Sequence, residues 1–246
     1  MERAGPHQII AITDSRICKG DLLERIELLA QSGVKAIILR EKQLGASEYR
    51  ALAEQSLAIC ARAGVACILH SFIEVARELK ASALHCQSSQ IAHLPRLRQE
   101  FATLGVSVHS VEEYRAAREW VDYVIVGHIF ASACKEGVEP KGLKLLESII
   151  TLESNFARRD SACGLESQSS FTKQTENLES TFEKQAECEN EDSNPALQGL
   201  YAIGGISLET LPLLHHLPIS GVCMRQTLMQ TPNPQNYIHR CRLTSH

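Results

Sequence analysis

Short apolar runs alternate with amphipathic segments along the chain from residue 8 to residue 224. The apolar runs are five or six residues long and rich in Ile, Val, Leu and Ala, which is typical of strands buried on both faces. There are eight: 8–13, 36–40, 65–69, 82–86, 105–109, 122–127, 200–205 and 220–224. A chain with this pattern predicts a parallel sheet with helical crossovers.

The segments between these runs repeat their apolar residues at three- and four-residue spacing, which predicts helices. They cover 21–33, 46–64, 72–80, 111–120, 141–150 and 207–217. Closing eight parallel strands into a cylinder removes every exposed sheet edge, so we expect a (β/α)8 TIM barrel of the α/β class. An open doubly wound sheet is the alternative, because periodicity does not report closure.

The length of 246 residues, with 44% hydrophobic residues, suits a single domain spanning 1–246. One segment breaks the alternation: residues 153–198 are rich in Ser, Gln, Glu and Asn. Such a composition buries too little apolar surface to offset the entropy lost on ordering. We expect a low-complexity, flexible insertion between the sixth helix and the seventh strand, acting as a solvated spacer or as a partner-binding arm.

Composition also limits the classes of partner. A net charge of −4 and a pI near 6.2 give no electrostatic basis for binding nucleic acid or an anionic membrane. The N-terminal residues lack a signal-peptide core, and no apolar run approaches the length of a membrane span, so we expect a cytoplasmic protein. Nine cysteines without a CxxC pair predict neither a disulfide framework nor a zinc site.

In a parallel barrel, the loops after the carboxyl ends of the strands form the active face. The residues at these ends are mostly cationic or polar. They are Thr13 and Asp14, Arg40 to Lys42, His70 and Ser71, Cys86 and Gln87, His109 and Ser110, His128, Gly204 and Gly205, and Met224 to Gln226. This face therefore suits a small anionic ligand.

Two of these ends point to anion binding. Arg40 follows a buried strand, and its planar guanidinium suits a phosphate or carboxylate, with Lys42 adding charge; the alternative is an internal ion pair. Gly204 and Gly205 let the backbone approach a ligand, amides at the start of the next predicted helix favour an anion, and Arg225 would lie beside them. The alternative there is a simple tight turn.

His128 ends the sixth strand, where an apolar run changes character at a single residue. Histidine side chains exchange protons near neutral pH, which makes this residue a candidate acid-base group. None of the Asp or Glu residues at the strand ends forms an obvious metal-binding pair with it. A structural histidine is the alternative.

These residues together resemble the thiamine phosphate synthase superfamily, a (β/α)8 barrel group that includes the synthase and the TenI-type thiazole tautomerase. The resemblance runs through AITDSR, LREK, VSVHSVEE, DYVIVGHIFASACKEGVEPKGL, YAIGGIS and SGVCM. It covers nearly everything outside the insertion. The superfamily implies enzymes of thiamine biosynthesis that bind phosphorylated thiazoles.

Departures from the pattern favour the tautomerase branch. The synthase holds magnesium with aspartates after its third and fourth strands, where this chain has Ser71 and Gln90. A hydroxyl and an amide are poor ligands for this hard cation. Ile38 replaces a glutamine that contacts the pyrimidine in the synthase, and GHIFASACK replaces a stretch resembling GPVFPTSTK.

The resemblance to the tautomerase implies that His128 is the catalytic acid-base group in aromatising a thiazole carboxylate phosphate. It implies substrate binding by Arg40, Lys42, His70, Lys135, Gly204, Gly205, Arg225 and Gln226. Gln226 replaces a family serine. His70 replaces a family asparagine, either as a simple polar substitution or as a second proton-transfer group. No metal or other cofactor is expected, and magnesium only if the protein is a synthase. The expected partner is a phosphorylated thiazole, and a homo-oligomer is left open.

Two other interpretations remain. One is a magnesium-dependent thiamine phosphate synthase, which couples a pyrimidine pyrophosphate to a thiazole phosphate. The other is a non-catalytic regulator that keeps the phosphate site and uses the insertion as its contact arm.

Overall fold

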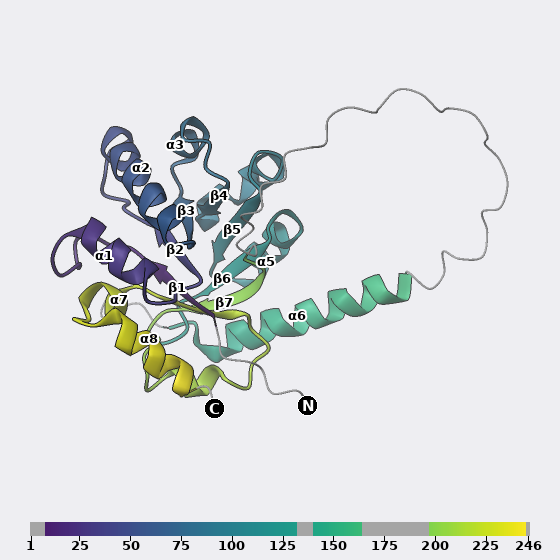
Figure 1. Cartoon of the computed structure of the whole chain (residues 1–246). Coiled ribbons are helices and arrows are strands. Elements are labelled where there is room, and N and C mark those ends of the chain that lie inside the picture. Colours follow the sequence, from purple (N-terminus) through teal and green to yellow (C-terminus); the bar gives the residue numbers. More distant parts are fainter. Residues whose placement is uncertain (1–7, 132–139, 164–196, 245–246) are drawn as a thin grey trace, which may run out of the picture.

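The computed structural model describes residues 8–131, 140–163 and 197–244, which form a closed eight-stranded parallel barrel (Figure 1). The strands are β1 (Gln8–Ile12), β2 (Ala36–Leu39), β3 (Ala66–His70), β4 (Ala83–Cys86), β5 (Thr103–Val108), β6 (Tyr123–Gly127), β7 (Gly199–Ile203) and β8 (Gly221–Met224). Strand β8 pairs with β1, with Ile10 opposite Cys223, and this pairing closes the barrel. The predicted TIM barrel is confirmed, and the open sheet is excluded.

Helices surround the barrel (Figure 1). They are α1 (Leu22–Ala30), α2 (Ala46–Arg62), α3 (Ile73–Glu78), α4 (Leu94–Leu97), α5 (Val111–Ala117), α6 (Gly142–Cys163), α7 (Gln226–Gln230) and α8 (Pro234–Leu243), with 3-10 helices η1 (Ser88–His93), η2 (Arg118–Trp120) and η4 (Leu211–Leu214). The helices α4, α7 and α8 and the 3-10 helix η1 were not predicted, because short segments and the polar, proline-led segment of α8 carry weak apolar periodicity.

The helix predicted over 207–217 is wrong, because only the 3-10 helix η4 forms there. The Thr210 hydroxyl accepts a hydrogen bond from the Ser207 amide at 2.9 Å and donates to the Gly205 carbonyl at 2.9 Å. Pro212 contributes no amide hydrogen to a helix. Side-chain bonds to the backbone thus replace the first turn of an α-helix.

Side chains from alternate strand positions fill the barrel interior, and those between them pack under the helices. The interior group includes Ile10, Ile38, Ile125, Tyr123 and Tyr201. Strand β5 passes close to the Tyr123 ring at Gly105, where any Cβ would collide with that ring. The interior is therefore a packed core below the mouth, as expected for a barrel of this size.

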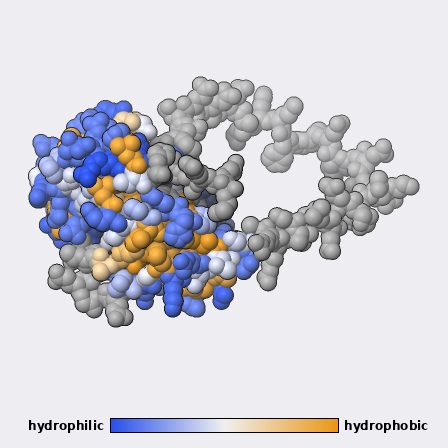
Figure 2. All heavy atoms as spheres, turned by 90° about the horizontal axis from the view of Figure 1, so that it is seen from below, coloured by the Kyte–Doolittle hydropathy of each residue, from blue (hydrophilic) through white to orange (hydrophobic). Residues whose placement is uncertain are grey.

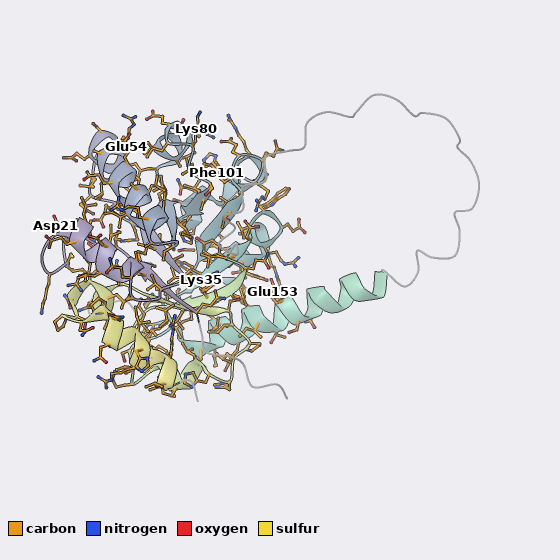
Figure 3. The ribbon with its side chains drawn as sticks, viewed as in Figure 1. Asp21, Lys35, Glu54, Lys80, Phe101 and Glu153 are labelled. Carbon is orange, nitrogen blue, oxygen red and sulfur yellow. The ribbon has the colours of Figure 1, made fainter. Side chains whose placement is uncertain are left out.

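Only part of the segment 153–198 falls on described residues. Helix α6 continues through it to Cys163 and projects away from the barrel (Figure 1). Glu153, labelled in Figure 3, still pairs with Arg118 at 3.6 Å. Leu197, at the far end of the segment, is buried in the barrel interior. The expected flexible insertion thus lies largely at 164–196, outside the described residues.

Apolar residues gather near the middle of the face seen from below, with hydrophilic residues around them (Figure 2). The exposed large apolar side chains among the described residues are Leu28, Leu213 and Leu243, which come from three different elements. None of the described helices has both the length and the apolar character needed to cross a bilayer. Because the three exposed large apolar residues come from different elements, this face by itself does not identify a partner.

Candidate active site

A cavity of about 430 Å³ opens at the carboxyl ends of the strands. This volume suits a small organic ligand. Eight of the nine predicted site residues line it: Arg40, Lys42, His70, His128, Gly204, Gly205, Arg225 and Gln226. Lys135, the ninth, lies outside the described residues. Residues far apart in the sequence are therefore brought to one site.

His128 follows the last residue of β6 and is only 4% exposed. The backbone after it is tied to β7, because the Ile129 amide donates to the Ile203 carbonyl at 2.8 Å and the Phe130 amide to the Gly204 carbonyl at 2.9 Å. The His128 carbonyl accepts from the Lys141 amide at 3.0 Å. These bonds fix the backbone from which the imidazole reaches the cavity wall.

Gly204 and Gly205 have backbone φ angles of +106° and +63°, which residues with a side chain rarely adopt. A Cβ on Gly204 would lie 2.7 Å from the His128 Cα, and one on Gly205 would lie 2.7 Å from the Phe130 Cβ. The glycines therefore admit the backbone that carries His128, a role that sequence reasoning did not assign. The helix start expected after them is absent, so the predicted anion binding at this turn depends on the amides of the two glycines.

Two guanidinium groups contact one buried carboxylate, and a third acts on it through its charge. Asp14 is 2% exposed, accepts two hydrogen bonds from Arg16 at 2.9 Å, and lies 3.5 Å from the Arg225 guanidinium. Burial alone would raise the pKa of Asp14, but the hydrogen bonds and charge of Arg16, with the charges of Arg225 and Arg40, lower it below its usual value. Positive charge thus exceeds negative charge at this side of the mouth.

Arg40 contributes a charge that the described residues do not neutralise by direct contact. No described carboxylate oxygen lies within 4.0 Å of its guanidinium, so the internal ion pair considered from the sequence is not formed there. Burial, followed by the charge of Arg225, lowers the pKa of Arg40. Arg40 and Arg225 line the same cavity, and two neighbouring guanidinium groups can hold an anionic ligand group.

Two buried histidines lie side by side on β3 and β4, and sequence reasoning recognised only the first. The His85 ring is 5.5 Å from the His70 ring. His85 contacts the Tyr123 hydroxyl through Nδ1 at 3.0 Å and the Ser107 hydroxyl through Nε2 at 2.8 Å. The alternation along β4 could have located His85 inside the barrel, because Leu84 and Cys86 pack under the helices.

The protein is expected to lose stability as the pH falls from 7.5 to 5.5. Burial, with smaller contributions from the charges of Lys42 and Arg40, lowers the pKa of His85 to about 3, whereas an unfolded histidine titrates near 6.5. The unfolded state binds more protons between these values, so stability is full above about 6.5 and decreases below it. Urea unfolding at both pH values measures the loss in the free energy of unfolding. The loss should be smaller in a His85→Gln variant. An equal loss in that variant would contradict the assignment of the effect to His85.

The positions where the synthase has magnesium-binding aspartates are engaged in other contacts. The Ser71 hydroxyl is 2.7 Å from the His70 Nδ1, and the Gln90 side chain donates to the Ser71 carbonyl at 3.0 Å. Gln90 also accepts from the Gln87 amide at 3.1 Å. Among the described residues, no group of three or more His, Cys, Asp or Glu is placed to hold a metal. These side chains do not fit a carboxylate magnesium site.

Comparisons with known proteins point to one family. A family described as thiamine monophosphate synthase matches residues 9–154. Curated thiamine-phosphate synthases are similar over the same part: one from Caldanaerobacter subterraneus is 28% identical over 145 residues, covering 57% of this chain and 68% of its own. Another from Listeria monocytogenes is 32% identical over 146 residues, covering 54% and 66%.

Two solved structures share the fold over nearly the whole chain. A thiamine phosphate pyrophosphorylase from Pyrococcus furiosus has a TM-score of 0.68 at 16% identity, covering 98% of this chain and 96% of its own. KGPDC from Streptococcus mutans has a TM-score of 0.56 at 12% identity, covering 97% of both chains. At such low identity these structures support the barrel fold alone.

Proposed function

Because the chain belongs to the thiamine monophosphate synthase family, we propose that it is a thiazole tautomerase-like isomerase that aromatises a thiazole carboxylate phosphate. The observation that carries this proposal is His128, buried at the wall of a cavity with neighbouring guanidinium groups. The carboxylate pair that magnesium would require is replaced by Ser71 and Gln90. The site thus supports proton transfer on an anionic ligand.

The proposed reaction moves one proton between two carbons. His128 removes a proton from a carbon of the non-aromatic ring, and the electron pair of that C–H bond enters the ring system. Protonated His128 then delivers a proton to a second carbon, so that the ring becomes aromatic with no net change in atoms or charge. A positioned acid-base group of this kind contributes about 10²- to 10⁴-fold to the rate.

The remaining cavity residues are proposed to hold the two anionic ends of the substrate. The amides of Gly204 and Gly205, with Arg225, take the phosphate, and Gln226 replaces a hydroxyl contact there. Arg40 and Lys42 take the carboxylate side. Lys135, which is expected from the sequence to bind substrate as well, lies outside the described residues. In this arrangement the ring lies between the two ends, within reach of His128.

The names of the curated relatives favour a second candidate, a thiamine phosphate synthase. One experiment separates the two. In the first assay, purified protein is mixed with EDTA and the unaromatised thiazole phosphate. The aromatic isomer should form, and proton NMR measures its formation. Protein with Mg²⁺, pyrimidine pyrophosphate and aromatic thiazole phosphate should form no thiamine phosphate. Mg²⁺-dependent coupling without isomerisation would replace the tautomerase with the synthase.

A further inference from the structure

His70 is a buried cavity residue to which the proposed isomerisation assigns no specific role. It ends β3, lines the cavity and is 5% exposed. Its backbone amide is held in place, because it donates to the Tyr49 hydroxyl at 2.9 Å, and that hydroxyl donates to the Leu39 carbonyl at 2.7 Å. The imidazole therefore has a fixed origin at the cavity wall.

Ser71 holds one edge of this ring. Its hydroxyl lies 2.7 Å from the His70 Nδ1, and its φ of +66° is unusual for a residue with a side chain. The Ser71 amide donates to the His85 carbonyl at 3.0 Å, which fixes the serine as well. When the serine hydroxyl donates to Nδ1, the proton of the neutral ring is on Nε2. Nε2 makes no hydrogen bond to any described residue, so in this tautomer its N–H is available to a ligand.

Two cations lie next to this ring. Strands β2 and β3 are in register with Leu39 opposite Leu69, so Arg40 follows β2 at the level of His70. Lys42 follows β2 and its ammonium donates to the Gln87 side chain beyond β4 at 2.7 Å, so it reaches across the end of β3. Burial first, and then the charges of His85, Lys42 and Arg40, lower the pKa of His70 well below its ordinary value. The ring is neutral at neutral pH and is surrounded by groups that attract anions.

We propose that His70 donates a hydrogen bond from Nε2 to the substrate carboxylate, completing an oxyanion subsite with Arg40 and Lys42, and that Ser71 positions it by fixing the tautomer. This inference rests on the proposed function for the identity of the ligand. A neutral donor adds a directed contact without adding a third charge. The neighbouring His85 cannot do the same, because both of its ring nitrogens are engaged inside the barrel.

The test compares two ligands by calorimetry: the aromatic thiazole carboxylate phosphate and the thiazole phosphate that lacks the carboxylate. His70→Phe should weaken binding of the carboxylated ligand about tenfold, as expected for a lost hydrogen bond to a charged group, and leave the other ligand unchanged. Ser71→Gly keeps the positive φ without strain and removes the hydroxyl, so it should cause a smaller loss for the same ligand only. His93→Asn, an exposed histidine on η1, is the control.

The outcomes separate the two proposals. Selective loss of the carboxylated ligand in His70→Phe, with partial loss in Ser71→Gly, supports the subsite. Equal effects on both ligands, or none, with wild-type binding intact, overturn the role of His70 and leave the tautomerase proposal standing. Failure of the wild-type protein to bind either ligand overturns both. Thermal unfolding of each variant shows whether a loss reflects misfolding.

Discussion

A His128→Asn variant is expected to aromatise the thiazole substrate about 10²- to 10⁴-fold more slowly than the wild-type protein while binding the product with similar affinity. Asparagine keeps a polar side chain of smaller volume but does not exchange protons near neutral pH. The backbone bonds from Ile129 and Phe130 to β7 do not depend on the imidazole, so the loop should keep its position. Proton NMR of reactions stopped at set times gives the rate, and calorimetry with the aromatic product gives the affinity.

The matched control is His93→Asn, because His93 is exposed on η1 and contributes nothing to the cavity wall. It should retain the wild-type rate. A His128→Asn protein that keeps a rate within about threefold of wild type would show that proton transfer belongs to another residue. Equal losses of rate and affinity would instead assign His128 to binding.

The sequence predicted the barrel well, because its strongest signal is local. Each of the eight predicted strands overlaps an observed one. Strands such as AIILR are buried on both faces, so they form continuous apolar runs that are easy to recognise in the sequence. The strand ends then follow from the fold, and most of the predicted site residues meet in one cavity. The roles of these residues stay predictions, because position does not report chemistry.

Most features that the sequence did not predict depend on contacts between residues far apart in the chain, and one depends on a local side-chain contact. His85 is a polar residue within an apolar run, and its partners Tyr123 and Ser107 come from β6 and β5. The pairing of Asp14 with Arg225 joins residues at opposite ends of the chain. The helix predicted over 207–217 is overridden by the side chain of Thr210. Periodicity can place His85 inside the barrel, but neither periodicity nor composition identifies the partners of these side chains.

A Gly204→Ala variant is expected to lose about 10²-fold in turnover even though it removes no polar group. The new Cβ would lie 2.7 Å from the His128 Cα, a distance that real Cβ contacts do not adopt, so the His128 segment must shift. A displacement of about 1 Å in a catalytic group costs roughly 10² in rate. The φ of +106° adds a backbone penalty of about 1–3 kcal/mol in stability. Turnover by NMR and urea unfolding measure the two effects separately.

Gly64→Ala separates displacement of His128 from the general cost of replacing a glycine at positive φ. Gly64 has φ of +66°, precedes β3 at the opposite end of the barrel from the cavity, and would place a Cβ with no described atom within 4 Å. This variant should lose about 1–2 kcal/mol in stability and keep its turnover. If Gly204→Ala behaves in the same way, with stability reduced and turnover intact, then His128 does not need the contact with Gly204, and its position in the reaction would have to be set by the β6 backbone alone.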